Sequence, residues 1–146
     1  MRTCKLPHSF LARPIAHRAL HDSNVRRVEN GIAAIDAAID GGFGIEIDVQ
    51  PSRDGHAMVF HDYDLGRVTT SKGPIAQRTA KELSELTYVT GETGIPTLPE
   101  VLSHVAGRAP LLIEIKDQDG MMGPNVGPLE RTVAQALAGY TGDVAV

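Results

Sequence analysis

Residues 44–62, GIEIDVQPSRDGHAMVFHD, decide the fold. Two apolar runs, 44–50 and 57–61, flank the segment PSRDG, whose proline and Asp-Gly pair are typical of a tight turn. Both runs therefore predict β-strands. The first run carries two acids, Glu46 and Asp48, among its apolar residues. Because successive side chains of a strand point to opposite faces, these acids share one face and the apolar residues occupy the other.

Short apolar runs alternate with helical patterns along the rest of the chain. Further strands are expected at 13–18, 109–117 and 142–146. Helical spacing predicts a first helix with Asn30 as its N-cap and Gly41–Gly42 as its end. Capping-box spacing predicts two more helices, which start at Thr79 and Thr97. A last helix is expected to begin at Pro128 and to end at Gly139.

Strands that alternate with helices predict a parallel sheet covered by helices, either a doubly wound sheet or a barrel. The glycine-rich nucleotide signatures of the open sheet are absent from the sequence. Polar residues instead accompany strand after strand: His17 and Arg18, Glu46 and Asp48, His61, then Glu114 and Lys116. In a βα barrel these strand ends converge on one mouth, where active sites lie. We therefore predict an α/β fold, a parallel βα barrel of the TIM type.

Three acids on the inward face of such a barrel require positive charge nearby to balance their negative charge. The alternation that turns Glu46 and Asp48 inward does the same for Glu114 and Lys116. Burying one uncompensated charge costs roughly several kcal/mol or forces its protonation. A divalent cation would resolve the repulsion, and all-oxygen ligands favour Mg²⁺ or Ca²⁺ over zinc. Lys116 would add a second positive charge on the same face.

Each of these features alone has a plain structural explanation. Acids at alternate positions of a strand usually face solvent, and a histidine at a strand end is usually a hydrogen-bonded structural residue. Their order along successive strands is what favours a functional site.

Composition narrows the class of protein. The chain has 146 residues, a net charge of −4 and no block of like charges, which argues against a nucleic-acid surface. Its single cysteine, Cys4, excludes an intrachain disulfide and a thiolate metal site. No segment has the pattern of a signal peptide or the length of a membrane span. We expect a cytoplasmic protein with a small-molecule substrate.

The ordered motifs resemble those of the glycerophosphodiester phosphodiesterases, a family of the phospholipase C-like phosphodiesterase superfamily. The resemblance covers residues 15 to about 117, and the segments DLGRVTT (64–70) and IPTLPEVL (95–102) resemble that family's connecting region. The matching motifs are His17–Arg18, Glu29–Asn30, Glu46-Ile-Asp48-Val49, Asp54–Gly55, His61–Asp62 and Glu114-Ile-Lys116.

This resemblance implies metal-dependent hydrolysis of glycerophosphodiesters to sn-glycerol 3-phosphate and an alcohol, within lipid and glycerol metabolism. It makes His17 and His61 the general acid and base, and either could start as the base. The residues that it assigns to the divalent metal, Mg²⁺ or Ca²⁺, are Glu46, Asp48 and Glu114.

The resemblance also implies roles for the remaining motif residues. Arg18 and Lys116 would neutralise phosphate oxygens, and the forked guanidinium of arginine suits the two free oxygens of a phosphodiester. The resemblance gives Glu29 and Asn30 a supporting role. Whether Asp62 orients a ligand or only caps a loop stays open.

Three positions depart from the family pattern around the first strand. Ala19 stands where glycine is usual, Val28 where proline commonly precedes Glu29, and Gly31 where threonine commonly follows Asn30. Alanine lacks the backbone freedom of glycine, so we expect a different path for the loop after the first strand.

The length of the chain leaves the barrel incomplete, because a full barrel needs about 250 residues. We expect residues 1–146 to form one domain, the N-terminal portion of a barrel truncated at its C-terminal side. Either the chain is a fragment, which we favour, or it is a natural half-barrel that covers its exposed sheet edges by self-association. Two further interpretations stay open: an inactive metal-binding half-domain serving as an interaction module, and a phospholipase-type enzyme acting on intact lipid.

Overall fold

The computed structural model describes residues 5–118, 121–124 and 126–146, and Cys4 lies outside them. The helices are α1 (Ser9–Ala12), α2 (Ile32–Asp40), α3 (Ala80–Ser84), α4 (Leu98–Val105) and α5 (Pro128–Leu137). The strands are β1 (Ile15–Ala16), β2 (Gly44–Pro51), β3 (Ala57–Val59), β4 (Leu111–Ile115) and β5 (Val144–Ala145). Three short 3₁₀ helices complete the list: η1 (Ser23–Val25), η2 (Leu65–Arg67) and η3 (Ile75–Gln77).

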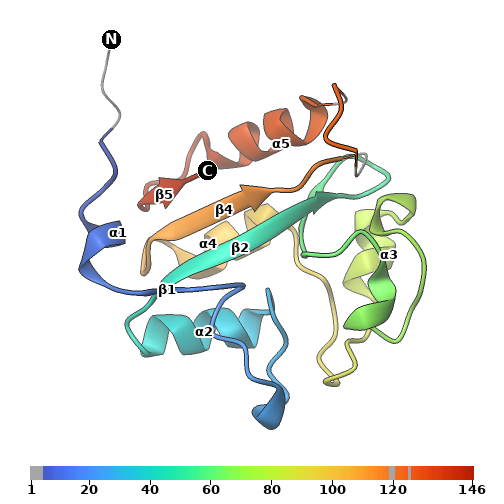
Figure 1. Ribbon diagram of the computed structural model, residues 1–146, viewed down its shortest axis with the longest axis horizontal. Coiled ribbons are helices and arrows are strands. Elements are labelled where there is room, and N and C mark those ends of the chain that lie inside the picture. The colour runs from blue at the N-terminus through green and yellow to red at the C-terminus, as the bar shows by residue number, and fades with distance from the viewer. Residues whose placement is uncertain (1–4, 119–120, 125) are drawn as a thin grey trace.

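The sheet has the order β1-β2-β4-β5, and all of these neighbours pair in parallel. A helix follows each of the first three strands along this path before the chain enters the next: α2, then α4, then α5. Figure 1 shows α2, α4 and α5 alongside β2 and β4, and α3 apart from them at one side. Four parallel strands in chain order, with helices between them, are half of an eight-stranded βα barrel.

Strand β3 differs from the prediction that His61 ends a further strand of the parallel series. It pairs antiparallel with β2, with Val49 opposite Val59, and forms a hairpin at the far end of β2. The chain therefore runs back along β2, and the Phe60 amide donates to the Asp48 carbonyl at 3.0 Å. His61 reaches the middle of β2 because of this reversal, not because it ends a parallel strand.

The predicted N-cap of α2 is wrong. Gly31 is the N-cap and gives no side-chain cap bond, whereas Asn30 has a φ of 58° and is buried. The side-chain amide of Asn30 is instead hydrogen-bonded to Asp48 on β2. The capping boxes of Thr79 and Thr97 are confirmed, since each threonine accepts from, and donates to, the glutamate three residues later.

The larger core lies between the sheet and its three covering helices. Ile45, Ile47 and Val49 alternate on the covered face of β2, and Leu111 and Ile113 do so on β4. A second, smaller core is formed by the segments around α3: Val28, Met58, Phe60, Leu65, Ile75, Leu83, Tyr88 and Ile95. The predicted split of apolar and acidic faces along β2 is therefore confirmed. Within the described residues, no helix is both long and apolar enough to cross a lipid bilayer.

Replacing Ile47 by alanine should lower the free energy of unfolding by about 2–5 kcal/mol, because the change leaves a cavity in the middle of the core. Ile47 is fully buried on β2. Leu11→Ala is the control, since Leu11 is 74% exposed and should change stability by less than about 0.5 kcal/mol. Urea unfolding followed by circular dichroism measures both, and equal effects of the two substitutions would contradict this core.

Candidate active site

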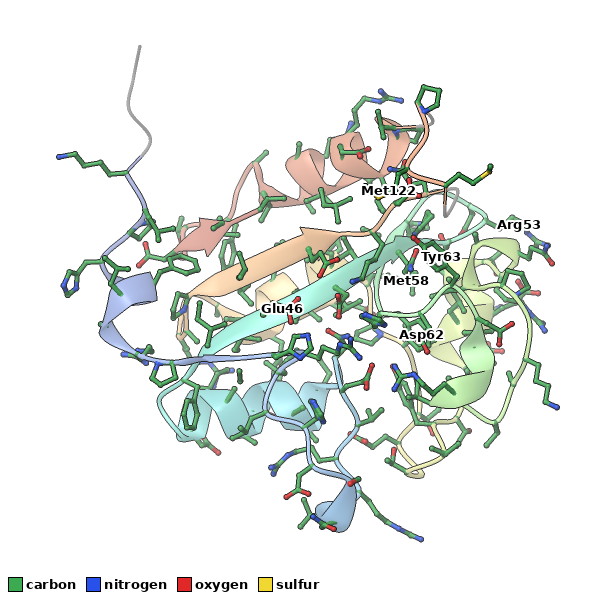
Figure 2. The ribbon with its side chains drawn as sticks, viewed as in Figure 1. Glu46, Arg53, Met58, Asp62, Tyr63 and Met122 are labelled. Atoms are coloured by element: carbon green, nitrogen blue, oxygen red, sulfur yellow. The ribbon has the colours of Figure 1, made fainter. Side chains whose placement is uncertain are left out.

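Three carboxylates converge on the uncovered face of the sheet. Asp48 and Glu114 lie opposite each other in the β2–β4 register, and Glu46 precedes Asp48 by one strand repeat. One ligand oxygen from each of the three lies within 4.8 Å of the others. Glu46 projects from the middle of β2 (Figure 2). The three acids predicted to share a metal are thus brought together, at a spacing that one cation could bridge.

Asp48 is the most deeply buried of them, with no exposed side-chain surface. Asn30 donates from Nδ2 to Asp48 Oδ2 at 2.9 Å, and accepts at Oδ1 from the Asp48 amide at 3.1 Å. The left-handed backbone of Asn30, which asparagine tolerates better than most residues, turns the amide toward β2. The predicted supporting role of Asn30 therefore has a geometric basis in this pair of hydrogen bonds.

Lys116 lies just beyond β4 and contacts two of the three acids. Its Nζ is 2.9 Å from Asp48 Oδ1 and donates to Glu114 Oε1 at 2.6 Å. The ammonium is therefore the internal counter-ion of this acidic cluster. Burial alone would lower the pKa of Lys116, but the hydrogen bonds from its ammonium to Glu114 and Asp48 outweigh burial and raise it.

Arg18 and Ala19 form the turn after β1, and both have left-handed backbones, with φ of 54° and 62°. The Arg18 amide donates to Glu46 Oε2 at 2.7 Å, and the Ala19 amide donates to the Glu46 carbonyl at 2.9 Å. Left-handed alanine is strained relative to glycine. Alanine therefore occupies a conformation that glycine adopts more freely, and the two backbone hydrogen bonds to Glu46 hold the turn in it.

His61 lies between two charged groups. Its Nδ1 is 2.6 Å from Asp62 Oδ1, and its Nε2 is 2.7 Å from Arg18 Nη2. The guanidinium of Arg18 also donates to Glu29 at 3.2 Å and lies 3.8 Å from Asp48 Oδ2. Arg18 therefore links His61, one of the two predicted acid–base histidines, to the acidic cluster, which places two of the predicted functional side chains in direct contact.

Arg67 is a residue of the site that the sequence did not predict. This residue ends η2 and donates to both Asp62 and Glu29. Arg67 lies in the segment DLGRVTT, which resembles the connecting region of the family. The signal available was an arginine in a motif segment, and nothing in the sequence indicated which acids it would reach.

His17 follows β1 directly and is exposed. It lines a hollow of about 540 Å³ together with Glu46 and Glu114. A second hollow, of about 850 Å³, is lined by His61, Lys116 and again Glu114. The two predicted acid–base histidines thus face separate hollows, and Glu114 borders both.

The electrostatics of the site follow from burial and pairing. Burial, followed by the charges of Asp48 and Glu114, raises the pKa of Glu46 despite the Arg18 amide hydrogen bond. Burial would also raise the pKa values of Glu29 and Asp62, but hydrogen bonds and charge from Arg67 outweigh it and lower both. The site therefore holds one acid that resists ionisation and two that are stabilised as anions.

Comparison with known proteins identifies the family of the chain. The sequence model of the glycerophosphoryl diester phosphodiesterase family matches residues 17–141. The chain belongs to this family. The match begins at His17 and includes every residue of the site described above.

One sequence relative and two solved structures extend this comparison. A glycerophosphodiester phosphodiesterase of Caldanaerobacter subterraneus is 37% identical over 116 residues, which are 74% of this chain and 46% of the relative. A phosphodiesterase structure from Oleispira antarctica, in complex with the product sn-glycerol-3-phosphate, matches with a TM-score of 0.79 and 28% identity, covering 94% of this chain and 57% of that one. A glycerophosphodiester phosphodiesterase from Agrobacterium tumefaciens matches with a TM-score of 0.72 and 30% identity, covering 90% and 55%.

The chain thus spans about half the length of the family members it matches. The predicted fold, part of a parallel βα barrel, is confirmed by this likeness and by the strand order.

Glu29→Gln should destabilise the chain by about 1 kcal/mol at neutral pH, because Arg67 and Arg18 lose their charged acceptor. The folded-state pKa of Glu29 is lowered from 4.5, so its charge stabilises the fold above that value. This stabilisation is lost as the pH falls through the folded-state pKa, and the difference between wild type and variant should shrink below pH 4.5.

Unfolding free energies measured from neutral pH down to acid, with a chelator present, check this dependence. Glu85→Gln is the control, because Glu85 is an exposed acid at the end of α3. A difference for Glu29→Gln that stays constant with pH would contradict the ion pairs described for Glu29.

Proposed function

We propose that the chain contributes the metal- and phosphate-binding half of an enzyme that hydrolyses glycerophosphodiesters to sn-glycerol 3-phosphate and an alcohol. The observation that carries the proposal is the convergence of Glu46, Asp48 and Glu114 beside two cationic side chains and His61. Family membership and the product bound to the Oleispira antarctica relative favour this substrate class.

The three carboxylates fit a hard divalent cation, Mg²⁺ or Ca²⁺. All three donors are oxygens, their spacing permits shared ligation, and two of them are buried. Burial raises the pKa of Glu46 first, and its two acidic neighbours add to the shift, which is the repulsion that a shared cation relieves. When bound, the metal would supply positive charge to the phosphate oxygens.

Arg18 and Lys116 are proposed to bind the phosphate. Both guanidinium and ammonium reach the edge of the carboxylate cluster, and neither side chain is committed to the apolar cores. Their charges would stabilise the negative charge that builds on the phosphate in the transition state. Because Lys116 contacts two of the proposed ligands, we expect it to turn toward the phosphate when substrate is present.

His61 is proposed as the general base and His17 as the general acid. A guanidinium has no acceptor, so Nε2 of His61, which faces Arg18, must itself be the acceptor and carries no proton. An unprotonated Nε2 can take the proton of the attacking group once Arg18 moves to the phosphate. His17, exposed across the Glu114 carboxylate, would then protonate the leaving alkoxide.

Turnover should depend on metal and on the buried ligand. With glycerophosphocholine as substrate, we expect release of sn-glycerol 3-phosphate that EDTA abolishes and Mg²⁺ or Ca²⁺ restores. Asp48→Asn should lose this activity and the metal-induced rise in Tm, because a buried anionic ligand becomes neutral. Asp40→Asn, at an exposed acid ending α2, is the matched control and should keep both.

The same assay separates the other interpretations. Metal binding without turnover would indicate a half-domain that serves for interaction, and hydrolysis of intact phospholipid or sphingolipid alone would indicate a phospholipase-type enzyme. Self-association through the edges of β1 and β5, and location in the cytoplasm, stay predictions.

His61→Gln should lower kcat by about 10²–10⁴-fold, because glutamine cannot accept a proton at neutral pH. Metal binding should be retained, since His61 contacts Arg18 and Asp62 rather than the acidic cluster. His56→Gln, in the hairpin between β2 and β3, is the control and should leave kcat unchanged. Steady-state kinetics and calorimetric Mg²⁺ titration distinguish the two effects; a kcat within threefold of wild type for His61→Gln would remove His61 from the reaction.

A further inference from the structure

Arg67 joins two acids that are distant in the sequence. Its Nε and Nη2 donate to Asp62 at 2.6 and 3.1 Å, and its Nη1 and Nη2 donate to Glu29 at 2.9 and 2.5 Å. Each carboxylate is therefore held by two nitrogens of one planar group. Only arginine among the side chains can serve two carboxylates in this way.

Both acids also contact residues that are proposed to take part in the reaction. Asp62 is 2.6 Å from His61 Nδ1, and Glu29 accepts from Arg18 at 3.2 Å. Since Arg18 also contacts His61 Nε2 at 2.7 Å, these hydrogen bonds close into a ring: Arg67, Asp62, His61, Arg18, Glu29 and back to Arg67. Arg67 touches neither histidine nor the acidic cluster, yet it supports both neighbours of His61.

The ring specifies one protonation state of His61. Nε2 faces a guanidinium, which can only donate, so Nε2 is the acceptor. The remaining proton of the neutral imidazole is then on Nδ1, where it is donated to Asp62. A carboxylate fixes this tautomer only if its own orientation is fixed, and the two bonds from Arg67 fix it.

Arg67 is not needed to hold its own loop. Leu65 is fully buried, its amide donates to the Gly73 carbonyl at 3.0 Å, and Asp64 caps η2 through the Gly66 amide at 2.7 Å. The Arg67 side chain is itself 48% exposed. Loop anchoring therefore does not explain why the guanidinium turns inward to two acids.

We propose that Arg67 is a positioning residue that fixes His61 in its Nδ1-protonated tautomer and holds Arg18 against its Nε2. The effect on turnover rests on the proposed acid–base function of His61, whereas the tautomer does not. An unprotonated Nε2, available once Arg18 turns to the phosphate, is what a general base requires.

The tautomer can be measured without substrate or metal. Long-range ¹H–¹⁵N spectra of the full 146-residue chain, labelled at histidine and recorded at neutral pH with EDTA, should show His61 protonated at Nδ1. In Arg67→Gln the two imidazole nitrogens should shift toward the Nε2-protonated form or toward an exchanging mixture. Arg67→Lys should lie between, because one ammonium cannot hold both carboxylates bidentately.

Arg53→Gln is the matched control. Arg53 also pairs with a glutamate, Glu82 at 3.6 Å, and lies at the periphery of the molecule (Figure 2). The Arg53→Gln substitution should leave the tautomer of His61 unchanged. The proposal is overturned if His61 gives wild-type signals in a folded Arg67→Gln or Arg67→Lys variant. An equal shift in Arg53→Gln would also overturn it. If Arg67→Gln does not fold, the Arg67→Lys spectrum alone tests the proposal.

Turnover gives a separate result. Where the wild type hydrolyses glycerophosphocholine, Arg67→Gln should lower kcat by about 10²-fold with little change in KM. A shifted tautomer with unchanged kcat would overturn the functional part. If the wild type shows no turnover at all, the proposed function fails and the spectra still decide whether Arg67 sets the tautomer.

Discussion

The carboxylate of Asp48 lies in the middle of β2 with none of its side chain exposed. A buried anion is stable only with hydrogen bonds and opposite charge around it. Asn30 supplies the hydrogen bond, Lys116 the close positive charge, and Arg18 a further cation at 3.8 Å. The segment between β1 and α2, strand β2 and the residue just beyond β4 therefore meet at this one side chain.

The same constraint explains the unusual backbone around the site. Asn30 and Arg18 both adopt left-handed conformations, and the backbone amide of Asn30 donates to the Arg18 carbonyl at 2.9 Å. These two strained residues lie at the positions where the chain passes from β1 toward α2. Strain of this kind persists when the surrounding structure over-determines it, which is common at functional sites. Here the hydrogen bonds to Asp48 and Glu46 are what hold the two residues in place.

Charge in the site is arranged in two connected parts. One part is the acidic cluster with Lys116, and the other is the pair of acids, Glu29 and Asp62, held by Arg67. Arg18 bridges them, since it contacts Glu29, His61 and Asp48. The family match extends over both parts, so the arrangement is placed in a known family of phosphodiesterases while the chain itself spans about half of its relatives' length.

Periodicity in the sequence determined the local elements and the division of faces. Alternation in IEIDV placed Ile47 in the core and Asp48 opposite it, and the spacing of Thr97 and Glu100 predicted the start of α4. It also determined which acids could meet, because residues on one face of neighbouring parallel strands lie close together.

The tertiary structure alone decided the partners of the long side chains and the place of His61 beside β2. The sequence placed His61 at the end of a parallel strand, whereas the hairpin brings it back along β2 by reversing the chain. The sequence also predicted that Asn30 caps a helix, whereas its side-chain amide is hydrogen-bonded to the carboxylate of Asp48, 18 residues away. Nor did it connect Arg67 with Glu29, 38 residues apart. Such contacts depend on how segments pack in space, and local spacing carries no information about that packing.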